Sequence, residues 1–167
     1  MTDTGSDTTR PGCPDDVAAI AAIYNDAVTS STATFDLAPV TAESRADWLA
    51  AHDELHPVLV AERAGEVVAW GSLSSVSRRG AWDGTVEIST YVDARHVNTG
   101  LGTLLGVALI ERARILGHHV VVSRVCAENE ASIHLAERLG FARAGVLHEV
   151  GRKFGRWLDV VLLEKQL

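Results

Sequence analysis

The segment Arg95–Leu105 (RHVNTGLGTLL) joins a strand pattern to a helix pattern, and this junction constrains the fold more than any other feature. Alternating apolar residues predict a strand over Thr85–Val92. A helix is predicted over Gly100–Leu116, where Gly117 follows as a left-handed terminator. A β-branched, buried strand is predicted over His119–Val125. A polar turn containing glycine therefore lies between a strand and the start of a long helix.

The remaining elements follow from the same periodicities. Further helices are predicted over residues 16–28, 41–52 and 129–139. Further strands are predicted over residues 58–62, 66–76, 142–149 and 157–163. The chain thus begins with two helices, continues with three strands, and ends with helix and strand elements in alternation. This order predicts a mixed α/β (α+β-like) sheet covered by helices.

Length and charge limit the classes of function. The 167 residues fit one domain over residues 15–167, and residues 1–14 (MTDTGSDTTRPGCP) are predicted to be a disordered tail without a secretory signal. A net charge of −7 argues against a general nucleic-acid or anionic-membrane surface. No apolar run reaches the roughly 18 residues of a membrane span. Cys13 and Cys126 are expected to be reduced thiols in the cytoplasm, with a disulfide between them as the alternative.

The turn before the long helix is suited to an anion. A helix start carries free backbone N–H groups and partial positive charge, and Gly100 and Gly102 allow a ligand close to the main chain. A Rossmann dinucleotide loop would need a third glycine where Leu105 stands, and a Walker loop would need a Gly-Lys pair that is absent. A phosphate site and a turn whose glycines serve packing both remain open at this point.

Several further motifs accompany the turn: STATF (Ser31–Phe35), NEAS (Asn129–Ser132), LGF (Leu139–Phe141) and GRKFGRWLD (Gly151–Asp159). Together with the strand TVEISTYV, they resemble the GNAT acyltransferase superfamily, and most closely its phosphinothricin and methionine sulfoximine N-acetyltransferase branch. The resemblance extends from about residue 15 to the C-terminus. It implies a twisted, mostly antiparallel sheet with one splayed parallel pair of strands, flanked by about four helices. It also implies an enzyme that uses acetyl-CoA and needs no metal.

The resemblance implies a cofactor site around the turn. Backbone N–H groups would hold the pyrophosphate, and the pantetheine arm would lie between the strands that end at Val92 and Val125. The residues expected to contact acetyl-CoA are Val92, Val97, Asn98, Thr99, Gly100, Leu101, Gly102, Thr103, Asn129 and Ser132. The chain departs from the family pattern at Val97, where a Gln or Arg is usual.

The resemblance also implies catalytic residues. Glu87 lies on the strand face that carries Ser89 and Tyr91, where the alternative is an ordinary solvated face. In the family a carboxylate at this position removes the proton that an alkylammonium must lose before it attacks a thioester. A main-chain N–H near Tyr91–Val92 would stabilise the oxyanion. The usual acid position holds Ala136, so Tyr91, water or an unprotonated thiolate remain as alternatives. His134 lies about 200° around the helix from that position.

The implied substrate is the primary amine of a small amino-acid analogue, and the branch is homodimeric. Arg79 would hold an acidic group of the substrate, and Phe35 and Trp82 would line the pocket. Trp157 would form the pocket wall or a dimer contact, and Lys153 would contact the hairpin or the substrate. Surface charge and ordinary core packing are the alternatives for these residues. Acetylation of a protein N-terminus or another amine, or acyl-CoA binding without catalysis, are the alternative functions.

Overall fold

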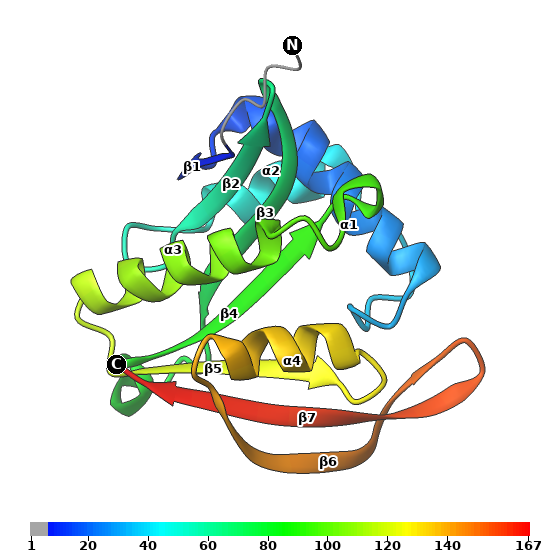
Figure 1. Ribbon diagram of the computed structural model, residues 1–167, viewed down its shortest axis with the longest axis vertical. Helices are drawn as coiled ribbons and strands as arrows, with labels where there is room; N and C mark the ends of the chain where they lie inside the picture. The colour runs from blue at the N-terminus through cyan, green and yellow to red at the C-terminus, as the bar shows by residue number, and fades with distance from the viewer. Residues whose placement is uncertain (1–6) are drawn as a thin grey trace.

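The computed structural model describes residues 7–167 and contains one seven-stranded mixed sheet with four α-helices in that range (Figure 1). The strands are β1 Thr8–Pro11, β2 Val58–Arg63, β3 Glu66–Ser75, β4 Thr85–Val92, β5 Val120–Cys126, β6 Ala142–Lys153 and β7 Arg156–Gln166. The helices are α1 Val17–Ser30, α2 Ala42–Ala50, α3 Leu101–Ile115 and α4 Glu130–Arg138. The sheet order is β1-β2-β3-β4-β5-β7-β6, and only β4 and β5 are parallel. The predicted mixed α/β class with one parallel pair is confirmed.

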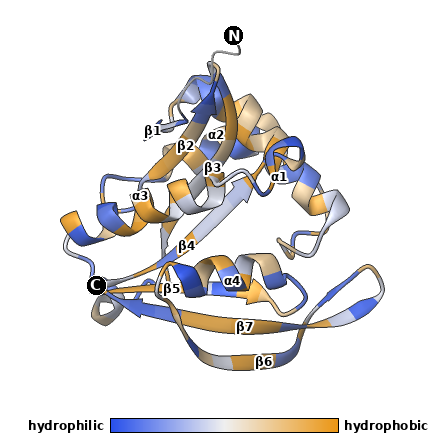
Figure 2. Cartoon of the chain, viewed as in Figure 1, coloured by the Kyte–Doolittle hydropathy of each residue, from blue (hydrophilic) through white to orange (hydrophobic). Residues whose placement is uncertain are grey.

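The two faces of the sheet carry separate hydrophobic cores. Helices α1 and α2 cover one face, where Tyr24 and Trp70 are buried. Helices α3 and α4 cover the other face, which includes Val86 and Ile88 of β4. Apolar colour along β2, β5 and β7 follows these cores (Figure 2). The predicted alternation along β4 is therefore confirmed, because Val86, Ile88 and Val92 pack in the α3–α4 core, whereas Tyr91 packs against the α1–α2 core. No helix within residues 7–167 combines the length and the apolar character needed to cross a bilayer.

Glycines allow α3 to pack closely against its neighbours. A Cβ atom at Gly71 of β3 would lie 2.7 Å from Leu109 Cδ1 of α3 and 2.7 Å from a β4 carbonyl oxygen. A Cβ atom at Gly106 would lie 2.4 Å from a methyl group of Leu139, just after α4. Both separations are too short for a side chain, so helix α3 is held close to the sheet and to α4. This packing fixes the position of its N-terminus.

The C-terminal hairpin is longer than the sequence predicted. Strands β6 and β7 run to a two-residue turn at Phe154 and Gly155, both with positive φ (50° and 76°). The residues between the two predicted strands, 150–156, therefore mostly belong to β6 and β7. Strand β6 contains two register shifts, between Arg143 and Gly145 and between Leu147 and Gly151. Such irregularities weaken a period-2 pattern, which explains the shorter prediction.

The predicted disordered tail is wrong for residues 8–11. These residues form β1, which pairs antiparallel with β2, while residues 1–6 lie outside the described part of the chain. Arg10 of β1 donates to Asp16 (2.7 and 2.8 Å) and to Glu62 of β2 (2.6 and 3.0 Å). A polar strand of this kind has no apolar alternation to predict it. Strand pairing and ion pairs hold it instead.

We expect acid to weaken this N-terminal attachment. The guanidinium of Arg10 lowers the pKa of the buried Asp16 carboxyl to about 2, from an ordinary value of 3.8. Because the folded-state pKa is depressed, the stabilisation is present above about pH 4 and is lost as the pH falls towards 2. Asp16→Asn should reduce the free energy of unfolding by roughly 2 kcal/mol at pH 7 and flatten its decline between pH 4 and 2.

Urea denaturation at pH 7, 4 and 2.5 measures both effects. Asp15→Asn, at an exposed neighbouring position, is the matched control and should behave as the unsubstituted chain does. An identical pH dependence for Asp16→Asn and the unsubstituted protein would contradict this account.

Candidate active site

The site is built around a split in the sheet. Strands β4 and β5 pair only where Thr85–Glu87 faces Val120–Val122. Beyond this point β4 continues along β3 to Val92, and β5 continues along β7 to Cys126. The two strands therefore diverge, as Figure 1 shows for β4 (green) and β5 (yellow). Main-chain groups that face the split are available to an extended ligand.

A groove of about 520 Å³ opens at the wide end of this split, between the end of β4, the turn before α3 and the start of α4. A smaller cavity continues from it into the split, and the two share Thr90, Tyr91 and Gly102. All the residues predicted to contact acetyl-CoA line the groove except Thr99. The Thr99 hydroxyl donates instead to the carbonyl oxygen of His96 (2.6 Å). The structure thus gathers residues from three segments, and their assignment to acetyl-CoA stays a prediction.

The start of α3 supplies unpaired main-chain donors. Gly100 is the N-cap residue in a left-handed conformation (φ 91°), and the first helical hydrogen bond runs from Leu104 N to Gly100 O. The N–H groups of residues 101–103 precede that bond, which leaves them free for an anion in the groove. Leu101 contributes only its main chain, because its side chain is buried in the core. These donors fit a diphosphate.

Gly102 has a packing role, which was one of the two alternatives left open for the glycines of this turn. A Cβ atom at this position would lie 3.0 Å from Leu135 Cδ2 of α4. The glycine therefore makes room for α4 as well as for a ligand. On α4 itself, the Asn129 side chain accepts a hydrogen bond from Ser132 N (3.2 Å) as the N-cap. Asn129 thus fixes the start of the helix that forms the far wall of the groove.

Arg138 is a groove residue that the sequence analysis missed. It lies in the last turn of α4 and lines the groove opposite the turn before α3. Its positive charge suits the phosphates of a nucleotide cofactor, whereas Val97 has no polar group to offer. A basic residue in the last helical turn was the available signal, but that pattern is also a common helix-end feature.

Glu87 lies at the last paired position of the split, and its carboxylate is held by an ion pair. Arg124 of β5 donates from Nε to Oε1 (2.7 Å) and from Nη2 to Oε2 (2.6 Å). The Glu87 side chain is 16% exposed, whereas that of Arg124 is 63% exposed and lines the cavity within the split. The hydrogen bonds to Glu87 raise the pKa of Arg124. A carboxylate and a cation therefore stand together where the two strands part.

Tyr91 lines both cavities, and aromatic packing holds its ring. The ring stacks on Trp70 with a centroid separation of 4.8 Å and meets Tyr24 edge-on at 5.1 Å. Burial raises the pKa of Tyr91 above its usual value, so its hydroxyl is protonated at neutral pH. It is thus able to donate a proton or a hydrogen bond, although the raised pKa makes it a weak acid.

The position of the usual family acid is occupied by a buried alanine. Ala136 lines the split and offers no proton. His134 is exposed and lines a different cavity, together with His148. His134 therefore does not line the split and does not replace the missing acid. Within residues 7–167, no group of three or more His, Cys, Asp or Glu side chains is placed to hold a metal ion.

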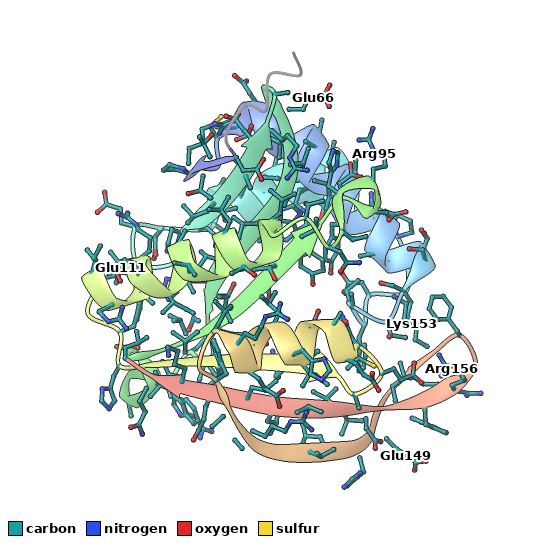
Figure 3. All side chains as sticks on the ribbon, in the orientation of Figure 1. Glu66, Arg95, Glu111, Glu149, Lys153 and Arg156 are labelled. Atoms are coloured by element: carbon teal, nitrogen blue, oxygen red, sulfur yellow. The ribbon has the colours of Figure 1, made fainter. Side chains whose placement is uncertain are left out.

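The predicted substrate residues fall into two groups. Lys153 is buried and points toward the loop after α1, where its Nζ donates to Thr34 O (2.7 Å) (Figure 3). Burial lowers the pKa of Lys153. Phe35, in the same loop, packs so closely on Gly151 that a Cβ atom there would lie 2.2 Å from its ring. These contacts tie the loop to the C-terminal hairpin, at the side of the sheet that carries Tyr91.

The other group lies on exposed surfaces of the protein. Arg79 immediately precedes the exposed 3-10 turn Gly80–Trp82, before β4 begins at the end nearer Glu87. Trp82 is 47% exposed. Trp157 is 60% exposed on the C-terminal hairpin, where the Arg152 guanidinium lies 5.6 Å from its ring centroid. The structure brings none of the five predicted substrate residues to the lining of the groove, Phe35 and Lys153 included, so their substrate roles stay predictions.

We expect Arg138 to contribute to cofactor affinity through its charge. Arg138→Glu should weaken binding of coenzyme A about 10-fold at low salt, and by less at high salt, because screening reduces interactions between exposed charges. Isothermal titration calorimetry at two ionic strengths measures the change. Arg112→Glu, on α3 beside a different cavity, makes the same charge change and should leave the affinity unaltered. Equal losses in both variants would contradict a local role for Arg138.

Comparison with known proteins agrees with this geometry. The family described as an acetyltransferase (GNAT) domain matches residues 13–162. The chain is 44% identical to an L-methionine sulfoximine/L-methionine sulfone acetyltransferase of Pseudomonas paraeruginosa, over 91% of this chain and 90% of that protein. It is 33% identical to a phosphinothricin N-acetyltransferase of Streptomyces coelicolor, over 95% of each chain.

A solved structure has the same fold. The putative acetyltransferase yncA of Salmonella typhimurium, solved with its cofactor acetyl-CoA, superposes with a TM-score of 0.94 at 38% identity, covering 98% of this chain and 95% of that one. The family match spans most of the sequence, and the relatives are covered nearly from end to end. The chain therefore belongs to the GNAT acetyltransferase family.

Proposed function

We propose that this protein transfers an acetyl group from acetyl-CoA to the primary amine of a small amino-acid-like substrate, of the methionine sulfoximine, methionine sulfone or phosphinothricin type. The names of its relatives support this substrate class. The observation that carries the proposal is the position of Glu87. A carboxylate stands where β4 and β5 separate, at the closed end of a split whose open end presents the free amides of α3.

The reaction we propose is direct attack in a ternary complex. The α3 amides hold the diphosphate and Arg138 adds positive charge. Glu87 accepts a proton from the substrate ammonium, directly or through one water. The freed amine forms the N–C bond to the thioester carbonyl carbon while a main-chain N–H near Val92 stabilises the oxyanion. The C–S bond then breaks, and we assign to Tyr91 the proton that the thiolate takes up. The attacking nitrogen loses its second proton as the amide forms, and this proton restores the Tyr91 hydroxyl. The products are the amide, coenzyme A and one proton released to solvent.

The central test is Glu87→Gln. It should lower kcat by about 10²–10⁴-fold at neutral pH, because the amide cannot accept the ammonium proton, while the affinity for acetyl-CoA stays unchanged. Thiol release with methionine sulfone as acceptor measures turnover, and calorimetry measures binding. Glu137→Gln is the matched control, since Glu137 is also ion-paired to an arginine but lies away from the split. Unchanged turnover in Glu87→Gln would remove the residue from the mechanism.

The same assay separates the alternative functions. Thiol release that requires an amino-acid analogue, and exceeds the hydrolysis of acetyl-CoA without an acceptor, supports the proposal. Turnover only with peptides or aminoglycosides would show that the proposed substrate class is wrong. Coenzyme A binding without thiol release from any amine would identify a non-catalytic binding module instead.

We also propose that the protein is a cytoplasmic homodimer. Support for the dimer comes from the outer strand β6 and its hairpin, where apolar side chains are exposed: Val146, Leu147, Val150, Phe154 and Trp157. An edge strand with exposed apolar residues is a ready surface for a second chain. The two cysteines are free thiols, as expected in a reducing compartment.

The dimer has its own test. Val150→Lys should shift the protein from dimer to monomer in light scattering after size exclusion, because a charge would be buried in the contact. Val107→Lys replaces an equally exposed valine of α3 (55% against 52%) and should leave the mass unchanged. A monomeric unsubstituted protein at micromolar concentration would contradict the proposal.

A further inference from the structure

The guanidinium of Arg124 has one edge occupied and one edge open. Its bonds to Glu87 use Nε and Nη2, which form one of the two edges that can bind a carboxylate with two parallel hydrogen bonds. An arginine carries five N–H donors, so the Nη1–Nη2 edge remains. That edge donates to no acceptor among residues 7–167. The side chain is 63% exposed and lines the split, so a second carboxylate has access to it.

The two side chains of the pair differ in solvent exposure, and an ion pair with only a structural role does not require this difference. Glu87 is the sheltered partner at 16% exposure, and Arg124 is the open one. An exposed ion pair contributes little to stability. The pair therefore adds little to the stability of the contact between β4 and β5. It does, however, place a fixed, bidentate cation directly beside the proposed base.

We infer that the free edge of Arg124 binds the α-carboxylate of the acceptor substrate, and that Arg124 thereby selects amino acids over simple amines. This inference rests on the proposed function. Sequence resemblance gave the acidic end of the substrate to Arg79, but Arg79 lies outside the groove lining, before an exposed turn. Arg124 was not predicted from the sequence, because its partner Glu87 lies 37 residues away.

The arrangement balances charge and positions the nucleophile. With the substrate bound, Glu87, Arg124, the α-carboxylate and the α-ammonium alternate in sign, so no charge at the split is left unpaired. The α-amine is one carbon atom from the α-carboxylate. Anchoring the carboxylate on Arg124 therefore brings the amine to the side of Glu87. Binding energy from a non-reacting group is thus used to orient the reacting one.

The test compares three amines that share one side chain: L-methionine sulfone, its α-carboxamide, and the amine that lacks the carboxyl group. For Arg124→Gln we expect kcat/KM on the acid to fall 10- to 100-fold, mostly through KM, while kcat/KM on the other two amines changes less than threefold. Arg124→Lys should recover part of the preference for the acid, because a point charge remains. Arg143→Gln, which also breaks an exposed arginine–glutamate pair, should leave the preference unchanged.

The outcomes are distinguishable. An equal fall on all three amines would overturn the inference, because Arg124 would then act only through Glu87. An unaltered preference for the acid would overturn it too. No turnover of any amine by the unsubstituted protein would refute the proposed function as well. If Arg124→Gln does not fold by circular dichroism, the Arg124→Lys preference decides, and a preference equal to that of the unsubstituted protein would count against the inference.

Discussion

The divergence of β4 and β5 is the constraint on which the rest of the structure depends. Two parallel strands pair over three residues and then separate, each held on its outer side by an antiparallel neighbour. A sheet that opens in this way leaves backbone donors and acceptors unpaired in its middle, which is costly unless a ligand or solvent satisfies them. An extended pantetheine arm is suited to this role. The separation also explains why Glu87, at the last paired position, lies beside the opening.

Close packing fixes the geometry around that opening. The absence of side chains at Gly71 and Gly106 lets α3 approach the sheet and α4. The N-terminus of α3 is consequently held at the wide end of the split, and the amides that we propose for the diphosphate need no ordering when a ligand arrives. Binding energy that would otherwise be used to order a loop remains available for affinity.

Local signals in the sequence predicted much of this fold. Strand β4 and helix α3 were predicted nearly residue for residue, because alternation and terminal glycines depend only on neighbours along the chain. The backbone does adopt positive φ at Gly117, as its role of helix terminator requires. Strand β1 was missed because an ion pair and pairing with distant β2 hold its polar residues.

The residues of the candidate site likewise include some that the sequence predicted and some that it did not. The turn before α3 was predictable, since its chemistry is mostly that of a local backbone. Arg124 and Arg138 were not predictable, because the contacts that give each of them a possible role come from segments distant in sequence. Arg79, Trp82 and Trp157 show the converse limit: a motif match identifies a position, but only the fold decides which cavity that position faces.

A crystal structure of this protein with bound coenzyme A tests the central claim most directly. The account predicts that the diphosphate accepts hydrogen bonds from the amides of residues 101–103, and that the thiol lies between β4 and β5 within reach of an acceptor amine held beside Glu87. Coenzyme A bound elsewhere, or a thiol on the far side of the sheet from the Glu87 carboxylate, would contradict it.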